Sequence, residues 1–212
     1  MNWLAQNWAQ VGELAWAHLR LSLPAILLSV LVAVPIGRLS FRYGRVGGAL
    51  TSTATLLYAI PALPMLIVVP ALVGVPLRSQ ANMIITLTLY GVALLVRSAA
   101  DGFASVDRTV RDSALAIGHS PLAAFWRVDL PLALPVIIAG VRVVAVSTIS
   151  LVTVGALIGV SSLGSLLTDG FQRGIFGEVL TGILATIALA LMVDAVVLLL
   201  GRALTPWLRV RA

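Results

Sequence analysis

The sequence has no cysteine and no lysine, and only 10% of its 212 residues are charged. The absence of cysteine excludes a disulfide framework and any metal site built on thiolates. The absence of lysine excludes an ATP site of the Walker type, in which a lysine contacts the phosphates. A soluble domain carries about 25% charged residues, so this chain has too little polar surface to face water all round. We expect no catalytic residue, no bound cofactor and no metal in this chain.

Apolar residues make up 60% of the sequence, and the mean hydropathy is +1.07. A bilayer core needs about 20 consecutive apolar residues for each helix that crosses it. Stretches of this kind occur at 19–37, 50–74, 81–98, 131–159 and 179–204. We therefore predict an all-α fold, a polytopic transmembrane bundle of five spans that forms a single domain over residues 1–212.

The positive charges are all arginines, and most of them lie between the apolar runs. Basic residues concentrate on the cytoplasmic side of a membrane protein. Three arginines fall on one side of the predicted spans: Arg20, Arg78 and Arg173. Ten fall on the other: Arg38, Arg42, Arg45, Arg97, Arg108, Arg111, Arg127, Arg202, Arg209 and Arg211. This asymmetry places the N-terminus outside and the C-terminus in the cytoplasm, and it differs from the basic face typical of nucleic-acid binding.

The first sixteen residues are too polar to cross a bilayer. Leu4, Trp8, Val11 and Ala15 would share one stripe of a helix. Tryptophan is common at the membrane–water interface. We predict a short helix over residues 1–16 that lies on the outer membrane surface; the alternative is a water-exposed extension of the first span.

Prolines interrupt two of the predicted spans: Pro24 and Pro35 in the first, and Pro61, Pro64 and Pro70 in the second. Proline removes a hydrogen-bond donor and bends a helix. A membrane protein tolerates such bends where neighbouring helices or a cavity satisfy the freed carbonyls. Bent helices suit a protein that opens a path, although fixed kinks also occur in static bundles.

The cytoplasmic connection over residues 99–130 is too long and too patterned for a simple link. Asp112 and Ser113 precede a helix-forming stretch that Gly118 can stop. Ser120 is placed to cap a second short helix, with Pro121 at its first position. We predict two short helices hinged at Gly118, where the backbone takes a positive φ.

The two predicted helices carry apolar residues that would form a knob at the cytoplasmic surface: Leu115, Ile117, Phe125 and Trp126. From the residues alone, this knob either docks to a partner or rests on lipid headgroups or on the base of the bundle.

Residues 112–131 read D-S-A-x-x-I-G followed by V-D-L-P, and they resemble the signature of binding-protein-dependent importer permeases, the type I ABC importer fold. That signature is E-A-A, three residues, Gly, about a dozen residues, then L-P. The chain departs from it at Asp112, which keeps the negative charge on a shorter stem, and at Ser113, which is small enough for close packing.

The resemblance implies that this loop is the coupling segment, which sits in a cleft of a cytoplasmic ATPase subunit. The residues it implicates are Asp112, Ser113, Ala114, Ile117, Gly118, Phe125, Trp126, Leu130 and Pro131. It further implies a bacterial cytoplasmic (inner) membrane and several partners: two ATPase subunits that hold ATP and Mg, a second permease copy or homologue, and an extracytoplasmic substrate-binding protein.

Four further segments resemble one branch of this family, the permeases for osmoprotectants such as glycine betaine, choline or carnitine. They read HLRLSLPAILLSVLVAVPIG, AIPALPM, PLALPVIIAGVRVV and ALIGVSSLG. The branch usually has A-G-G-L-G where residues 160–164 read V-S-S-L-G, and serine restricts backbone that glycine leaves free. The alternatives are another small solute, such as an amino acid, or a secondary transporter that works without an ATPase.

Two charges lie within the predicted spans, Arg142 and Asp194. Each lies about 11 residues, or roughly 16 Å, from the cytoplasmic end of its span, so we predict that they pair, directly or through water. Tyr58 and Tyr90 are the main aromatic residues within the spans and are the weak candidates for a substrate path. Asp169, Arg173 and Glu178 fall in an outer loop, where ordinary solvated charges are the favoured interpretation over contacts to a binding protein.

Overall fold

The computed structural model describes residues 2–207, which form helices and connecting turns with no β-strand in that range. The main helices are α1 (Asn2–Arg42), α2 (Gly44–Ala59), α3 (Ala62–Val73), α4 (Gln80–Ala104), α5 (Arg108–Ala116), α6 (Pro121–Ala124), α7 (Leu130–Val152), α8 (Gly164–Arg173) and α9 (Phe176–Leu204). A π-helical turn, η1 (Phe125–Asp129), joins α6 to α7, and a 3₁₀ turn, η2 (Thr153–Ile158), extends α7.

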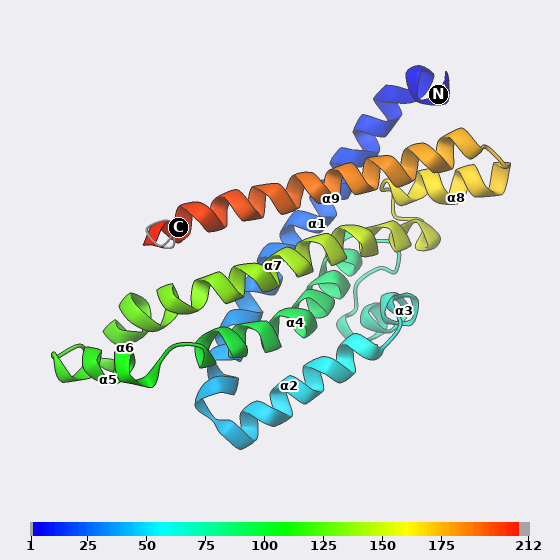
Figure 1. Cartoon of the computed structure of the whole chain (residues 1–212). Coiled ribbons are helices and arrows are strands. Elements are labelled where there is room, and N and C mark those ends of the chain that lie inside the picture. Colours follow the sequence, from blue (N-terminus) through cyan, green and yellow to red (C-terminus); the bar gives the residue numbers. More distant parts are fainter. Residues whose placement is uncertain (1, 208–212) are drawn as a thin grey trace.

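Four helical stretches are long and apolar enough to cross a membrane: α1, α4, the continuous run from α6 to η2, and α9. The bent pair α2–α3 counts as a fifth crossing when the two helices are taken together as one span. The start of α1 and the end of α9 lie at opposite ends of the bundle (Figure 1), as an odd number of crossings requires. The predicted all-α bundle of five spans is confirmed in this form. Arg209 and Arg211, part of the charge count, lie outside the described residues.

The second span, predicted over residues 50–74 with an interruption at its prolines, is broken into two separate helices. The axes of α2 and α3 differ by 111°. Ile60 precedes a proline and takes an extended conformation (φ −70°, ψ 130°), because the ring of Pro61 clashes with a helical residue before it. Pro64 lies in the first turn of α3, where the missing donor costs little. The bend therefore has a local cause in the proline sequence.

Of the short helix predicted over residues 1–16, the structure describes residues 2–16, and these do not form a helix of their own. Helix α1 runs from Asn2 to Arg42, and its only non-helical residue is Asn7 (φ −123°, ψ 20°). The stretch from Trp8 onward is therefore continuous with the first span. Val11 and Ala15 pack against the protein, whereas Trp8 is 73% exposed. Contact of this stretch with the membrane surface stays a prediction.

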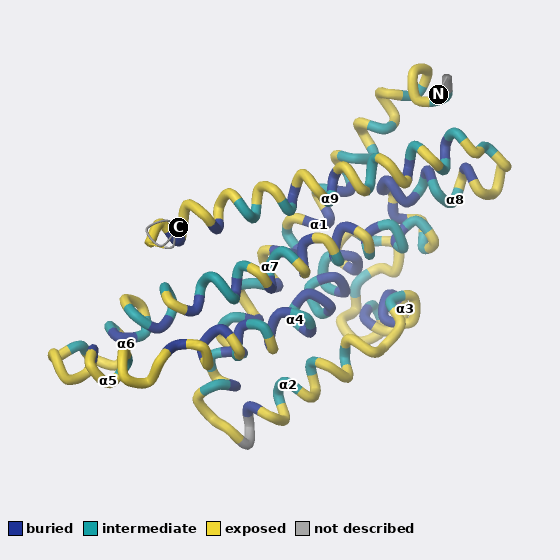
Figure 2. The backbone as a smooth tube through the Cα atoms, in the orientation of Figure 1, coloured by how far each residue is buried: buried dark blue, intermediate teal, exposed yellow. Residues whose placement is uncertain are grey.

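The core lies where α1, α4 and α7 pack together, and small residues allow these helices to approach closely. A Cβ added at Gly37 of α1 would lie 2.5 Å from Cβ of Ala99 in α4 and 2.9 Å from the backbone nitrogen of Ala100. Gly140 of α7 meets Ser98 of α4 in the same way. Buried positions follow α4 and α7, while α2 and α9 are exposed along much of their length (Figure 2). Helix α4 is thus the centre of the bundle.

Helix α8 was not predicted. Its final residue, Arg173, forms an ion pair with Glu178 of α9, with nitrogen–oxygen distances of 2.7 and 2.8 Å. Glu178 is fully buried, so it is not the solvated charge that we expected, whereas Asp169 is exposed. Ser162, one of the serines in the V-S-S-L-G segment, accepts a hydrogen bond from the backbone of Gly164 at the start of α8. No described residue other than glycine has a positive φ, so these serines introduce no backbone strain.

We predict that Gly37→Ala destabilises the bundle, because the added methyl group meets backbone that cannot rotate away. Overpacking of this kind costs about 1–3 kcal/mol, which lowers the midpoint of thermal unfolding in detergent. Gly12→Ala, in the same helix with nothing within 4 Å, is the matched control and leaves the midpoint unchanged or slightly raised. Equal midpoints for the two variants would contradict the close packing of α1 on α4.

Candidate functional site

The cytoplasmic segment begins with a well-capped helix. The carboxylate of Asp107 accepts hydrogen bonds from the hydroxyl and the backbone N–H of Thr109, both at 2.8 Å. These bonds, the hydroxyl one first, lower the pKa of Asp107. Helix α5 therefore begins at Arg108, earlier than we predicted, and Asp112 and Ser113 lie within it rather than before it.

Helix α5 ends where the sequence predicts. The backbone N–H groups of Gly118 and His119 bond to the carbonyls of Leu115 and Ala114, and Gly118 has φ +93°. The predicted positive φ at Gly118 is confirmed. A left-handed residue at this point closes the helix and reverses the chain.

The second short helix continues into the membrane. The hydroxyl of Ser120 accepts a hydrogen bond from the N–H of Ala123 at 3.2 Å, and Pro121 is the first residue of α6. The π-helical turn η1 then carries the chain into α7, and the N–H of Leu130 bonds to the carbonyl of Phe125. Helices α6 and α7 thus form one continuous stretch, with Leu130 and Pro131 inside it rather than at a break.

The segment presents an apolar surface to solvent, which we call the apolar knob: Leu115, Ile117, Leu122 and Trp126. Ile117 is 79% exposed and Leu122 is 69% exposed. Leu122 was not predicted as part of this surface. Phe125 was expected in this set, but it packs inward against the ring of Phe103, with centroids 6.0 Å apart. Ala114 is buried beneath the knob.

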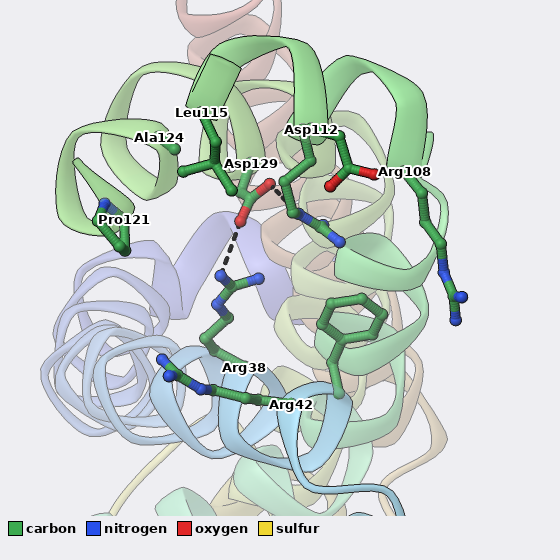
Figure 3. A pocket seen from close by; sticks show the side chains of 10 residues that line it. Arg38, Arg42, Arg108, Asp112, Leu115, Pro121, Ala124 and Asp129 are labelled. Atoms are coloured by element: carbon green, nitrogen blue, oxygen red, sulfur yellow. Dashed lines mark hydrogen bonds and ion pairs between the residues drawn. The ribbon is translucent and has the colours of Figure 1, made fainter. Parts of the chain in front are cut away.

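A charge cluster holds the knob to the bundle. Asp129, in η1, has a side chain only 2% exposed, and it pairs with Arg38 of α1 and Arg111 of α5, each at 2.7 Å. Figure 3 shows the Asp129 carboxylate directed toward Arg38. A buried carboxylate is stable only when paired, so one side chain ties together three separate segments of the chain.

Aromatic rings surround the arginines of this cluster. The guanidinium carbon of Arg38 lies 5.1 Å from the ring centroid of Phe125 and 5.3 Å from that of Phe103. Phe41 lies 5.0 Å from Arg111 in the same manner. Cation–π attraction of this kind is strongest where water is excluded. Phe125 therefore points inward because its ring packs against the guanidinium group of Arg38.

Asp129 stands within V-D-L-P, and its role was not predicted from the sequence. The available signal was an acidic residue at the start of a span, on the side of the membrane that carries most of the arginines. The partners lie 91 and 18 residues away along the chain, so spacing alone did not identify them.

The two charges within the spans form a pair, as their equal depth in the membrane predicts. Arg142 and Asp194 form a bidentate pair, with both nitrogen–oxygen distances at 2.7 Å. Their side chains remain 40% and 21% exposed on the isolated chain. His18 is fully buried, and its Nε2 lies 2.9 Å from the carbonyl oxygen of Ile149.

The two tyrosines named as substrate-path candidates lie next to each other. The rings of Tyr58 and Tyr90 are edge to face, with centroids 6.0 Å apart. They line a cavity of about 470 Å³ at the bend between α2 and α3.

Residues 25–210 match a family described as binding-protein-dependent transport system inner membrane component. The chain is 30% identical to the glycine betaine/carnitine/choline transport system permease protein OpuCD of Bacillus subtilis, over 95% of this chain and 87% of that protein. It is 28% identical to the osmoprotectant import permease protein OsmW of Salmonella typhimurium, over 97% of each chain.

Solved structures share the fold at lower sequence identity. A chain of the MetNI methionine ABC transporter in an inward-facing conformation superposes with a TM-score of 0.79 at 17% identity, covering 92% of this chain and 96% of that one. A chain of an amino acid ABC transporter with histidines gives a TM-score of 0.67 at 14% identity, with 96% of each chain covered.

We predict that Asp129→Asn releases the cytoplasmic segment, because it removes the negative charge that two guanidinium groups share. Loss of one partner of a buried pair costs about 3 kcal/mol. Trypsin should then cleave after Arg108 and Arg111 several times faster than in the native chain. Asp101→Asn, at an exposed carboxylate near the end of α4, is the control. Unchanged cleavage in Asp129→Asn would show that the cluster does not hold the segment.

Proposed function

The chain belongs to the family of binding-protein-dependent transport system inner membrane components, and from this premise we propose that it forms half of the translocation pathway of an ATP-driven importer for a quaternary-ammonium osmoprotectant. The observation that carries the proposal is the family match over residues 25–210 together with the apolar knob that α5, α6 and η1 expose on the cytoplasmic side.

The ATPase is a separate chain in this proposal. This sequence has no lysine and no glycine-rich phosphate loop, so ATP and Mg are held by two cytoplasmic ATPase subunits. The apolar knob is the surface that one of them covers. Ile117, Leu122 and Trp126 lose exposed apolar area when they are covered, which favours association. Asp112, on the exposed side of α5, offers a charge at the edge of the same surface.

The route from the ATPase to the pathway follows the continuous stretch from α6 to η2. Residues Pro121–Ile158 form one helical unit, and Asp129 attaches that unit to α1 through Arg38. A movement imposed on the knob is therefore transmitted to the membrane as a displacement of packed helices. Alternating access follows when ATP-driven closure of the ATPases moves two such units, one in each permease.

The remaining partners cover surfaces that this chain leaves open. A second permease copy or homologue completes the pathway, and an extracytoplasmic binding protein delivers substrate at the end of the bundle that carries α8. The Arg142–Asp194 pair supports a covered membrane face, because partly exposed charges inside a bilayer are costly unless protein or water surrounds them.

The substrate is inferred from the curated relatives. OpuCD of Bacillus subtilis is named for glycine betaine, carnitine and choline, and OsmW for osmoprotectants. These substrates share a quaternary ammonium group or a similar osmoprotective role. We assign this chain to glycine betaine or a related quaternary amine, and we place the main selectivity in the binding protein.

We predict that Gly118→Val leaves a membrane-inserted protein that no longer copurifies with its ATPase. A β-branched residue at φ +93° costs about 1–3 kcal/mol of backbone strain, which distorts the turn below the knob. Gly74→Val is the matched control, because Gly74 has φ +76° and nothing within 4 Å, but lies outside the cytoplasmic segment. Retained copurification and uptake in Gly118→Val would show that the segment is only a linker.

We also predict that cells whose other osmoprotectant importers have been deleted require this system to accumulate glycine betaine or choline under osmotic stress. Uptake of labelled glycine betaine and of labelled methionine, with and without the gene, is the measurement. Methionine uptake that quaternary amines do not inhibit would refute the substrate and leave the permease assignment in place.

A further inference from the structure

The bend between α2 and α3 borders an open cavity of about 470 Å³ within the membrane-spanning part of the bundle. Its polar groups come from three helices: Tyr58 at the end of α2, Tyr90 in α4, and Ser147 and Ser150 in α7. Tyr90 lies ten residues into α4, or about 15 Å from the outer end of that helix. The volume is in the range of small-molecule sites, which run from about 300 to 1,000 Å³.

The backbone at this bend offers partial charges of both signs, because α2 ends here and α3 begins at Ala62. Helix α2 ends at Ala59, and the carbonyl groups of a helix C-terminus carry about half a negative charge. The hydroxyl of Tyr90 donates a hydrogen bond to the carbonyl of Ile60, which fixes the irregular backbone. Irregular backbone at membrane depth is tolerated where it is buried in protein or lines a water-filled cavity, and the ends of broken helices serve as ion sites in transporters.

The side chains of the cavity suit a cation that cannot form hydrogen bonds. Tyr58 and Tyr90 both line it, and their rings stand edge to face at an interplanar angle of 76°. Tyr58 is 45% exposed on the isolated chain. A quaternary ammonium group binds to aromatic faces through cation–π attraction. The residues that line the cavity include no arginine, which would repel a cation, and no carboxylate, which would hold the cation too tightly for release.

The opposite wall carries hydroxyl groups. Neither Ser147 nor Ser150 uses its hydroxyl in a hydrogen bond among the residues that the structure describes. Hydroxyl groups can donate to a carboxylate. The cavity thus offers aromatic rings and a helix C-terminus to a cation, and hydroxyl donors to an anion, within one space.

We propose that this cavity is a transient binding site for the zwitterion during translocation, with the quaternary ammonium against Tyr58 and Tyr90 and the carboxylate against Ser147 and Ser150. This proposal rests on the proposed function for its substrate class. It adds a second, weaker point of chemical selection inside the permease, after release from the binding protein.

The test uses the full permease–ATPase complex in lipid nanodiscs without the binding protein. Saturation-transfer NMR compares glycine betaine with 3,3-dimethylbutanoate, in which a carbon replaces the charged nitrogen. We expect the native complex to bind glycine betaine about tenfold more tightly than this isostere, which keeps the carboxylate but lacks the positive charge, within the range that cation–π attraction supplies. Tyr58→Leu should abolish the preference, whereas Tyr58→Phe, which keeps a ring face, should retain most of it.

Leu56→Ala is the matched control, because Leu56 is 70% exposed on the same helix and does not line the cavity. Equal binding of the two ligands to the native complex, or an unchanged preference in Tyr58→Leu, would overturn the proposal. Uptake of glycine betaine by cells with the native chain is measured in parallel. Uptake without preferential binding refutes the cavity alone, whereas preferential binding without uptake of any quaternary amine refutes the proposed function.

Discussion

A carboxylate with a side chain 2% exposed must be paired, and in this chain that requirement falls on Asp129. Arg38 of α1 and Arg111 of α5 both pair with this carboxylate. The end of the first span, the cytoplasmic segment and the start of α7 are therefore held together at one charge. The position of the apolar knob and the inward turn of Phe125 both depend on this convergence. The cluster thus fixes the orientation that the cytoplasmic segment presents to any partner.

A related constraint governs the membrane-embedded part, where every freed backbone group needs a partner within the protein. Polar side chains of the helices meet it at the irregular points. The amide of Asn82 donates to the carbonyls of Leu66 and Leu77, at 2.9 and 2.8 Å, and so fastens α3 to α4. At the bend, the hydroxyl of Tyr90 in α4 likewise donates a hydrogen bond to the carbonyl of Ile60. The break in the second span is therefore supported from α4, which allows an irregular backbone to persist beside a cavity.

Patterns that depend on distance along one element were predictable from the sequence. Apolar length predicted the spans, equal depth predicted the Arg142–Asp194 pair, and helix-stop chemistry predicted the positive φ of Gly118. Features that depend on the docking of distant segments were not predictable. Asp129 and the direction of Phe125 follow from the approach of α1 to η1, which no local pattern encodes. The bend at Pro61 lay between these cases, because the prolines indicated an interruption but not which one breaks the helix.

The continuous stretch from α6 to α7 has a mechanical consequence. Ser150 lies 21 residues beyond Asp129, or about 31 Å along a helix. If the stretch pivots at the Asp129 cluster as a stiff rod, a tilt of about 10° displaces Ser150 by about 5 Å, since an arm of this length multiplies a small rotation. The short cytoplasmic side and the long membrane side thus act as the two unequal arms of a lever. A slight movement at the surface becomes a displacement comparable to the width of a small solute.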